Sequence, residues 1–161
     1  MKTTCPPVDC TRAADDLIRS SAEYLRQVNS YGNGVRMYVA LATAIVSARQ
    51  SIRNLEEQYD FDTNDKLPAA VFAKVVNQNQ VLAGLMQDQA SALTALGRAR
   101  GYLRRRSNEL AAERRALLDL ACTDPSNAHR RKACERYELT KRDLAGPGLE
   151  KFDAMLAAAM G

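Results

Sequence analysis

The residues with the clearest chemical potential in this sequence are its cysteines, Cys5, Cys10, Cys122 and Cys134. They fall in two close pairs, and an even number of paired cysteines is typical of disulfide bonds. Of the three possible connectivities, the spacing favours Cys5–Cys10 together with Cys122–Cys134. Closing the second loop is worth about 3 kcal/mol in the chain-entropy model. Because disulfides form in oxidising compartments, we expect a periplasmic or secreted protein, with four free thiols in the cytosol as the alternative.

A metal or catalytic site can also be imagined around the single histidine, His129, with Cys122 and Cys134 beside it. The spacing of these cysteines matches no common zinc pattern, and a fourth ligand is missing. The chain has no G-x-S-x-G elbow, P-loop, G-x-G-x-x-G or H-E-x-x-H motif. We therefore expect no cofactor, no metal and no enzymatic activity.

Basic residues form the other distinctive group. Residues 98–143 contain 13 Lys and Arg against 7 Asp and Glu, whereas the rest of the chain contains 10 against 12. The residues expected to contact a partner are Arg98, Arg104, Arg105, Arg106, Arg114, Arg115, Arg130, Arg131 and Lys132. Such a cluster suits a nucleic acid, an acidic protein surface or another anionic partner such as lipopolysaccharide. Only Tyr102 and Tyr137 could stack on bases nearby, which argues against nucleic acid and favours a protein.

The element that must position these arginines is a long helix over 66–122. Mostly apolar residues recur every seven positions along it, and this first row consists of Val75, Leu82, Gln89, Leu96, Leu103, Leu110 and Leu117. A second row lies three residues after positions of the first and consists of Leu85, Ala92, Ala99 and Leu120. Such spacing predicts a heptad seam, on which Gln89 would fix the register at some cost in stability. The seam could pair within the chain or join two chains as a homodimer.

The remaining pattern is all-α, since Ala, Leu, Arg and Gln dominate the 161 residues and Trp is absent. Residues 1–10 are expected to form an irregular lead because of Pro6 and Pro7. Further helices are expected over 11–29, 35–59 and 125–144, with a short C-terminal helix over 149–160. Polar residues and glycines at 29–34 predict a break between the first two helices.

Together these elements predict a single domain over residues 1–161. We expect an antiparallel four-helix bundle with one very long helix and a projecting hairpin clasped by Cys122 and Cys134. The apolar face of the long helix is thick before Gly97, where Phe72 and Met86 should pack inside the bundle. It becomes thin afterwards, as expected for a two-helix hairpin.

The sequence also bears on location and function. No apolar run approaches the roughly 18 residues of a membrane span. The first ten residues contain no hydrophobic signal segment, although a chain written in mature form would look the same. We expect a non-enzymatic, protein-binding module of the bacterial envelope, such as a secretion-system adaptor or a toxin-neutralising immunity protein. The alternative is a cytosolic nucleic-acid-binding or coiled-coil regulatory protein that uses the basic hairpin.

Overall fold

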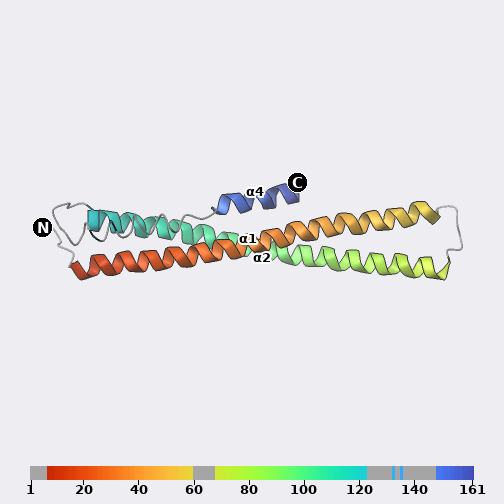
Figure 1. Ribbon diagram of the computed structural model, residues 1–161, viewed down its shortest axis with the longest axis horizontal. Helices are drawn as coiled ribbons and strands as arrows, with labels where there is room; N and C mark the ends of the chain where they lie inside the picture. The colour runs from red at the N-terminus through yellow and green to blue at the C-terminus, as the bar shows by residue number, and fades with distance from the viewer. Residues whose placement is uncertain (1–6, 60–67, 123–131, 133–134, 136–147) are drawn as a thin grey trace. The chain divides into compact units, whose positions relative to one another are not determined.

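The computed structural model describes residues 7–59, 68–122, 132, 135 and 148–161, with side chains for residues 12–59, 68–116, 132, 135 and 148–161. These residues are 97% helical and form three helices and no strand. The helices are α1 over Pro7–Tyr59, α2 over Ala69–Cys122 and α4 over Leu149–Met160 (Figure 1). Within the described ranges, no helix combines the length and the apolar character needed to cross a membrane.

The chain divides into two compact units. Unit 1 consists of Met1–Tyr31 and Ala99–Lys151, and unit 2 consists of Gly32–Arg98 and Phe152–Gly161. Within each unit, a segment of α1 runs antiparallel to a segment of α2 (Figure 1). The two long helices therefore contribute to both units.

In unit 2, the heptad seam of α2 lies on the interior face. Val71 and Leu96 are buried, and the seam positions between them, Val75, Gln78, Leu82, Leu85, Gln89 and Ala92, are half-buried, as is Leu93 beside the seam. The seam positions from Val71 to Leu96 alternate in steps of four and three, which is the spacing of a coiled-coil row. The buried residues of α1 in this unit are Val35, Tyr38, Ile45 and Ala48. The predicted seam therefore packs within the chain in this unit.

Unit 1 repeats this arrangement. The buried residues of α1 are Ala14, Leu17, Val28 and Tyr31. On α2, Leu103 is 1% exposed, and Ala99, Arg106 and Leu110 are half-buried. The seam positions Leu117 and Leu120 lie outside the described side chains. One row of contacts on each helix thus supplies the core of this unit among the described residues.

The predicted break at 29–34 is wrong, because α1 continues through it without interruption. Glycine in a helix interior costs about 1 kcal/mol relative to alanine, which is why the sequence suggested a loop. Because glycine has no side chain, residues of other helices pack directly against the backbone of α1 at these two positions. A Cβ atom at Gly32 would overlap the ring of Phe152, and one at Gly34 would lie 2.9 Å from Cδ2 of Leu96. Contacts with two other helices therefore hold this stretch helical.

Phe152 attaches α4 to α1 in unit 2. Its ring is 1% exposed and lies at Gly32, and the Cζ atom of Arg36 lies 5.6 Å from the ring centroid. A guanidinium at this distance from an aromatic face gains a favourable cation–π interaction. Leu156, one turn further along α4, is also buried. The two apolar side chains give α4 a single packed face.

Two helix starts also differ from expectation. Residues 7–10 belong to α1 rather than to an irregular lead, so that expectation is wrong for them. Proline is tolerated in the first turn of a helix because its missing N–H would have no partner there, which suits Pro7. The long helix begins at Ala69 rather than at 66, and the carbonyl of Pro68 accepts hydrogen bonds from the backbone N–H groups of Val71 and Phe72 at 2.9 and 3.0 Å. α4 covers the range expected for the short C-terminal helix.

The four-helix bundle and the disulfide-clasped hairpin are not confirmed. Two of the predicted helices are one continuous α1. The predicted helix over 125–144 lies outside the described residues except at positions 132 and 135, and the side chains of all four cysteines lie outside them as well.

Replacing Gly32 by alanine tests the close approach of α4. The added methyl group would displace Phe152, and we expect a loss of about 2 kcal/mol in the free energy of unfolding because an aromatic side chain leaves the core. Gly97→Ala is the matched control, since its Cβ would meet no atom within 4 Å. This control should gain up to about 1 kcal/mol from helix propensity. Urea unfolding followed by circular dichroism measures both, and equal stability of the two variants would contradict the proposed contact.

Candidate functional site

Most of the predicted partner-binding residues lie on the second half of α2. Residues 98–115 contain seven arginines and two glutamates. The exposed arginines are Arg98, Arg104, Arg105 and Arg115, and the half-buried ones are Arg100, Arg106 and Arg114. Lys132 is exposed, whereas Arg130 and Arg131 lie outside the described residues. The structure therefore keeps a strong local excess of positive charge accessible on α2.

Three of the exposed arginines share one side of α2 in unit 1. Arg104 and Arg115 are separated by eleven residues, or about three helical turns, so that they lie nearly in line. Arg105 follows Arg104 and lies about 100° around the helix. We call Arg104, Arg105 and Arg115 the arginine face.

Arg106 is different because it occupies a position on the interior seam. Its Nη1 atom donates hydrogen bonds to Glu109 Oε2 at 3.0 Å and to Glu113 Oε1 at 3.2 Å. The hydrogen bond with Glu109 is the main reason that the pKa of the Arg106 guanidinium is raised; partial burial opposes this effect, and Glu113 adds to it. Both glutamates of residues 98–115 thus contact this one arginine. Arg106 was predicted to contact a partner, but its geometry indicates a structural role on the seam.

The cysteine and histidine sites predicted from the sequence lie outside what the structure describes. The side chains of Cys5, Cys10, Cys122 and Cys134, and residue His129, are not among the described groups. In the part of the chain that is described, no three His, Cys, Asp or Glu side chains come together as a metal site would require. The disulfide pairing stays a prediction.

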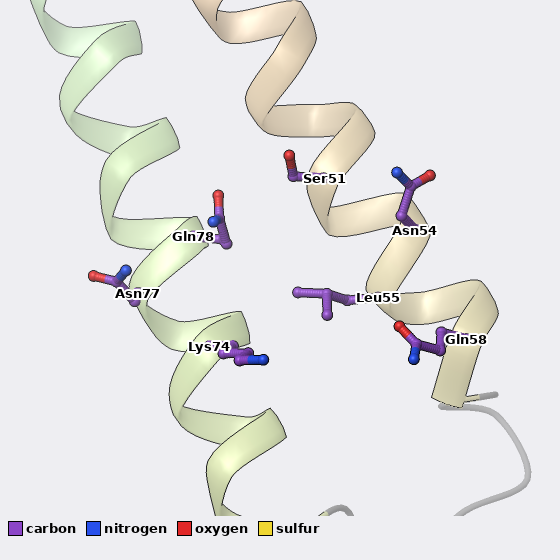
Figure 2. A pocket seen from close by; sticks show the side chains of 7 residues that line it. All are labelled: Ser51, Asn54, Leu55, Gln58, Lys74, Asn77 and Gln78. Atoms are coloured by element: carbon purple, nitrogen blue, oxygen red, sulfur yellow. The ribbon is translucent and has the colours of Figure 1, made fainter.

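Unit 2 contains an open polar pocket of about 370 Å³ between α1 and α2 (Figure 2). Its lining consists of Ser51, Asn54, Leu55, Gln58, Lys74, Asn77 and Gln78. The hydroxyl of Ser51 donates to the carbonyl of Ser47 at 3.1 Å, and Gln50 Nε2 donates to Asn54 Oδ1 at 2.9 Å. The lining therefore offers amide groups, a hydroxyl and the ammonium group of Lys74 for hydrogen bonding.

An exposed apolar stripe on α2 is a feature that sequence reasoning missed. Phe72, Val76 and Met86 are 59%, 40% and 45% exposed. The expectation that Phe72 and Met86 pack inside a bundle is therefore wrong for this chain. The same row contains three more exposed residues, Asn79, Ala83 and Ala90. The six residues are spaced alternately by four and three positions and lie beside the buried seam. This spacing was visible in the sequence, but it could not show that these side chains are exposed in the folded chain.

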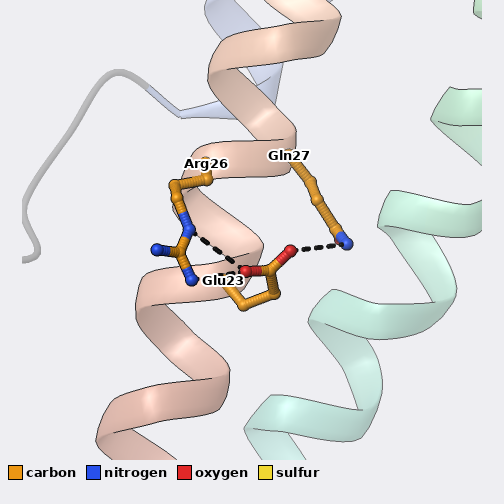
Figure 3. Close-up of polar contacts among 3 residues, drawn as sticks. All are labelled: Glu23, Arg26 and Gln27. Atoms are coloured by element: carbon orange, nitrogen blue, oxygen red, sulfur yellow. Dashed lines mark hydrogen bonds and ion pairs between the residues drawn. The ribbon is translucent and has the colours of Figure 1, made fainter.

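The surface of α1 in unit 1 also carries local polar contacts (Figure 3). Glu23 Oε2 accepts a hydrogen bond from Arg26 Nε at 3.1 Å, and Glu23 Oε1 accepts one from Gln27 Nε2 at 3.4 Å. Exposed pairs three or four residues apart stabilise a helix by about 0.2–0.5 kcal/mol each. We interpret this cluster as support for the helix rather than as a binding site.

Comparisons with protein-family models, with curated proteins and with solved structures find no match to this chain.

Replacing Arg106 by leucine tests its structural role. Leucine would extend the apolar seam between Leu103 and Leu110, and exchanging a partly buried ion pair for apolar packing is often neutral or stabilising. We expect the free energy of unfolding to rise by up to about 1 kcal/mol in urea titrations. The control, Arg105→Leu, changes an exposed position and should stay within about 0.5 kcal/mol of the original protein. A clear loss of stability in R106L alone would show that the contacts with Glu109 and Glu113 outweigh packing.

Proposed function

We propose that this chain is a non-enzymatic helical module that binds another protein through the arginine face of α2. The observation that supports the proposal most strongly is the distribution of charge over residues 98–115. This stretch has seven arginines and two glutamates, and both glutamates contact Arg106 on the seam. Arg105 and Arg115 are exposed on the helix surface. The helix thus has a local excess of positive charge, and Arg105 and Arg115 present part of it to the solvent.

The partner surface that best fits this face is acidic. Arginine presents a planar fork of donors that matches a carboxylate with two parallel hydrogen bonds. The helix holds the three side chains on one element, so that several carboxylates of one partner can bind them together. We include in this proposal an envelope or secreted location and a role as a secretion-system adaptor or an immunity protein.

We also propose that the chain contains the predicted helix over 125–144 and the predicted disulfides. A further helix over 125–144 and a disulfide between Cys122 and Cys134 would close the chain segment that follows α2. Such a clasp would stiffen the region beyond the arginine face and support its use as a contact surface. The second predicted bridge joins Cys5 and Cys10.

Charge reversal tests the arginine face. We expect the double variant R105E/R115E to bind fluorescently labelled poly-L-glutamate at least about tenfold more weakly in anisotropy titrations, because each arginine supplies a charge-assisted hydrogen bond. The matched control is R49E/R53E, which reverses two exposed arginines on α1 and changes the net charge equally. Its affinity should remain close to that of the original protein.

The same titration with a short DNA duplex separates the two classes of partner. Stronger binding to DNA than to poly-L-glutamate, with a steep loss at higher salt, would overturn the proposal and favour a nucleic-acid-binding protein. Equal weakening in R105E/R115E and R49E/R53E would also overturn it, because the effect would then reflect net charge alone.

The disulfide prediction is tested by intact mass under denaturing conditions, before and after reduction, followed by peptide mapping of alkylated cysteines. We expect two bridges, Cys5–Cys10 and Cys122–Cys134. Four free thiols in freshly prepared, unoxidised protein would remove the reason for placing the chain in an oxidising compartment.

A further inference from the structure

The exposed apolar stripe of α2 in unit 2 differs in chemistry from the arginine face. We define the stripe as Phe72, Val76, Asn79, Ala83, Met86 and Ala90, all of which are exposed. No charged residue occurs between Lys74 and Asp88, and these two are the only charged residues from Ala69 to Gly97. At 100° per residue, Lys74 lies on the opposite flank of the seam from the stripe. A protein surface of this kind is typical of a site that another protein covers.

We infer that the occupant of this stripe is a second copy of the chain, packed antiparallel along α2 about a two-fold axis between Asn79 and Ala83. This interaction is independent of the arginine face and goes beyond the proposed function. The stripe extends for about 27 Å along the helix, which is enough for several layers of side-chain packing. The two copies would bring their α1–α2 pairs together around a shared apolar core, as in bundles of four helices.

The spacing of the stripe supports this register. Its residues follow one another in steps of four, three, four, three and four, a series that reads the same in both directions. An antiparallel pair about the stated axis therefore places Val76 opposite Met86 of the second copy. It also places Phe72, the largest side chain of the stripe, opposite the small Ala90, and Asn79 opposite Ala83. Large side chains facing small ones fill space without overlap.

The absence of charge also favours a second copy as the occupant. In a two-fold interface, the same patch of both subunits meets itself, so a charge near the axis approaches an identical charge. The stripe avoids this repulsion because it contains no ionisable side chain. Asn79 is its one polar member, and its Nδ2 atom already donates to the carbonyl of Val75 at 3.0 Å. Covering Asn79 would therefore not remove this hydrogen bond.

Analytical ultracentrifugation of the full chain tests the inference. We expect a dimer at protein concentrations of about 0.1 mM, and we expect the variant V76E/M86E to raise the dimer dissociation constant at least about 100-fold, because glutamates would oppose each other in both layers. The variant V76K/M86E should have a dimer dissociation constant at least about tenfold lower than that of V76E/M86E, because Lys and Glu then oppose each other only in the antiparallel register.

Val81→Glu is the control, since Val81 is exposed on the same helix but lies on the other flank of the seam. It should leave the dissociation constant unchanged. Circular dichroism should show equal helicity for all variants, because each changed side chain is exposed within one chain. A monomer at the stated concentration, a dimer that V76E/M86E leaves intact, or no difference between V76K/M86E and V76E/M86E would overturn the inference.

Discussion

The pairing of α1 with α2 along one narrow row of side chains is the constraint on which the rest of this structure depends. A pair of helices buries only one face of each helix, and α4 adds to the core of unit 2 only through Phe152 and Leu156. Leu96 and Leu103 are therefore buried, whereas residues one position away, such as Gly97 and Arg104, are exposed. The two surfaces that we propose to bind partners lie outside that row.

Close approach modifies this constraint at one place. Gly32 and Gly34 sit within α1, where their flexibility in the unfolded state makes them unfavourable for a helix. The absence of side chains lets Phe152 and Leu96 pack directly against the backbone of α1. Local propensity and tertiary packing thus oppose each other here, and packing prevails because it buries an aromatic ring that would otherwise be exposed.

The two halves of α2 differ more in chemistry than in backbone structure. Residues 98–115 combine seven arginines with two glutamates, whereas the half from Ala69 to Gly97 has only two charged residues. A charged exposed face favours recognition by an acidic surface, and an uncharged apolar face favours association by exclusion of water. The two proposed surfaces on this helix therefore differ in the chemistry of the partner that each would bind.

Heptad spacing was sufficient to predict α2 and its interior row, because periodic apolar residues report directly on which face of a helix is covered. It also placed Arg104, Arg105 and Arg115 outside that face, and these three are exposed. Three features could not be read in this way. The continuity of α1 depends on the contacts of Gly32 and Gly34 with other helices, and the exposure of Phe72 depends on which faces the other helices cover. Arg106 contacts two glutamates of its own helix, but its structural role depends on its partial burial on the seam. Each of these features depends on how helices pack together, and periodicity along one helix carries no information about the helices that pack beside it.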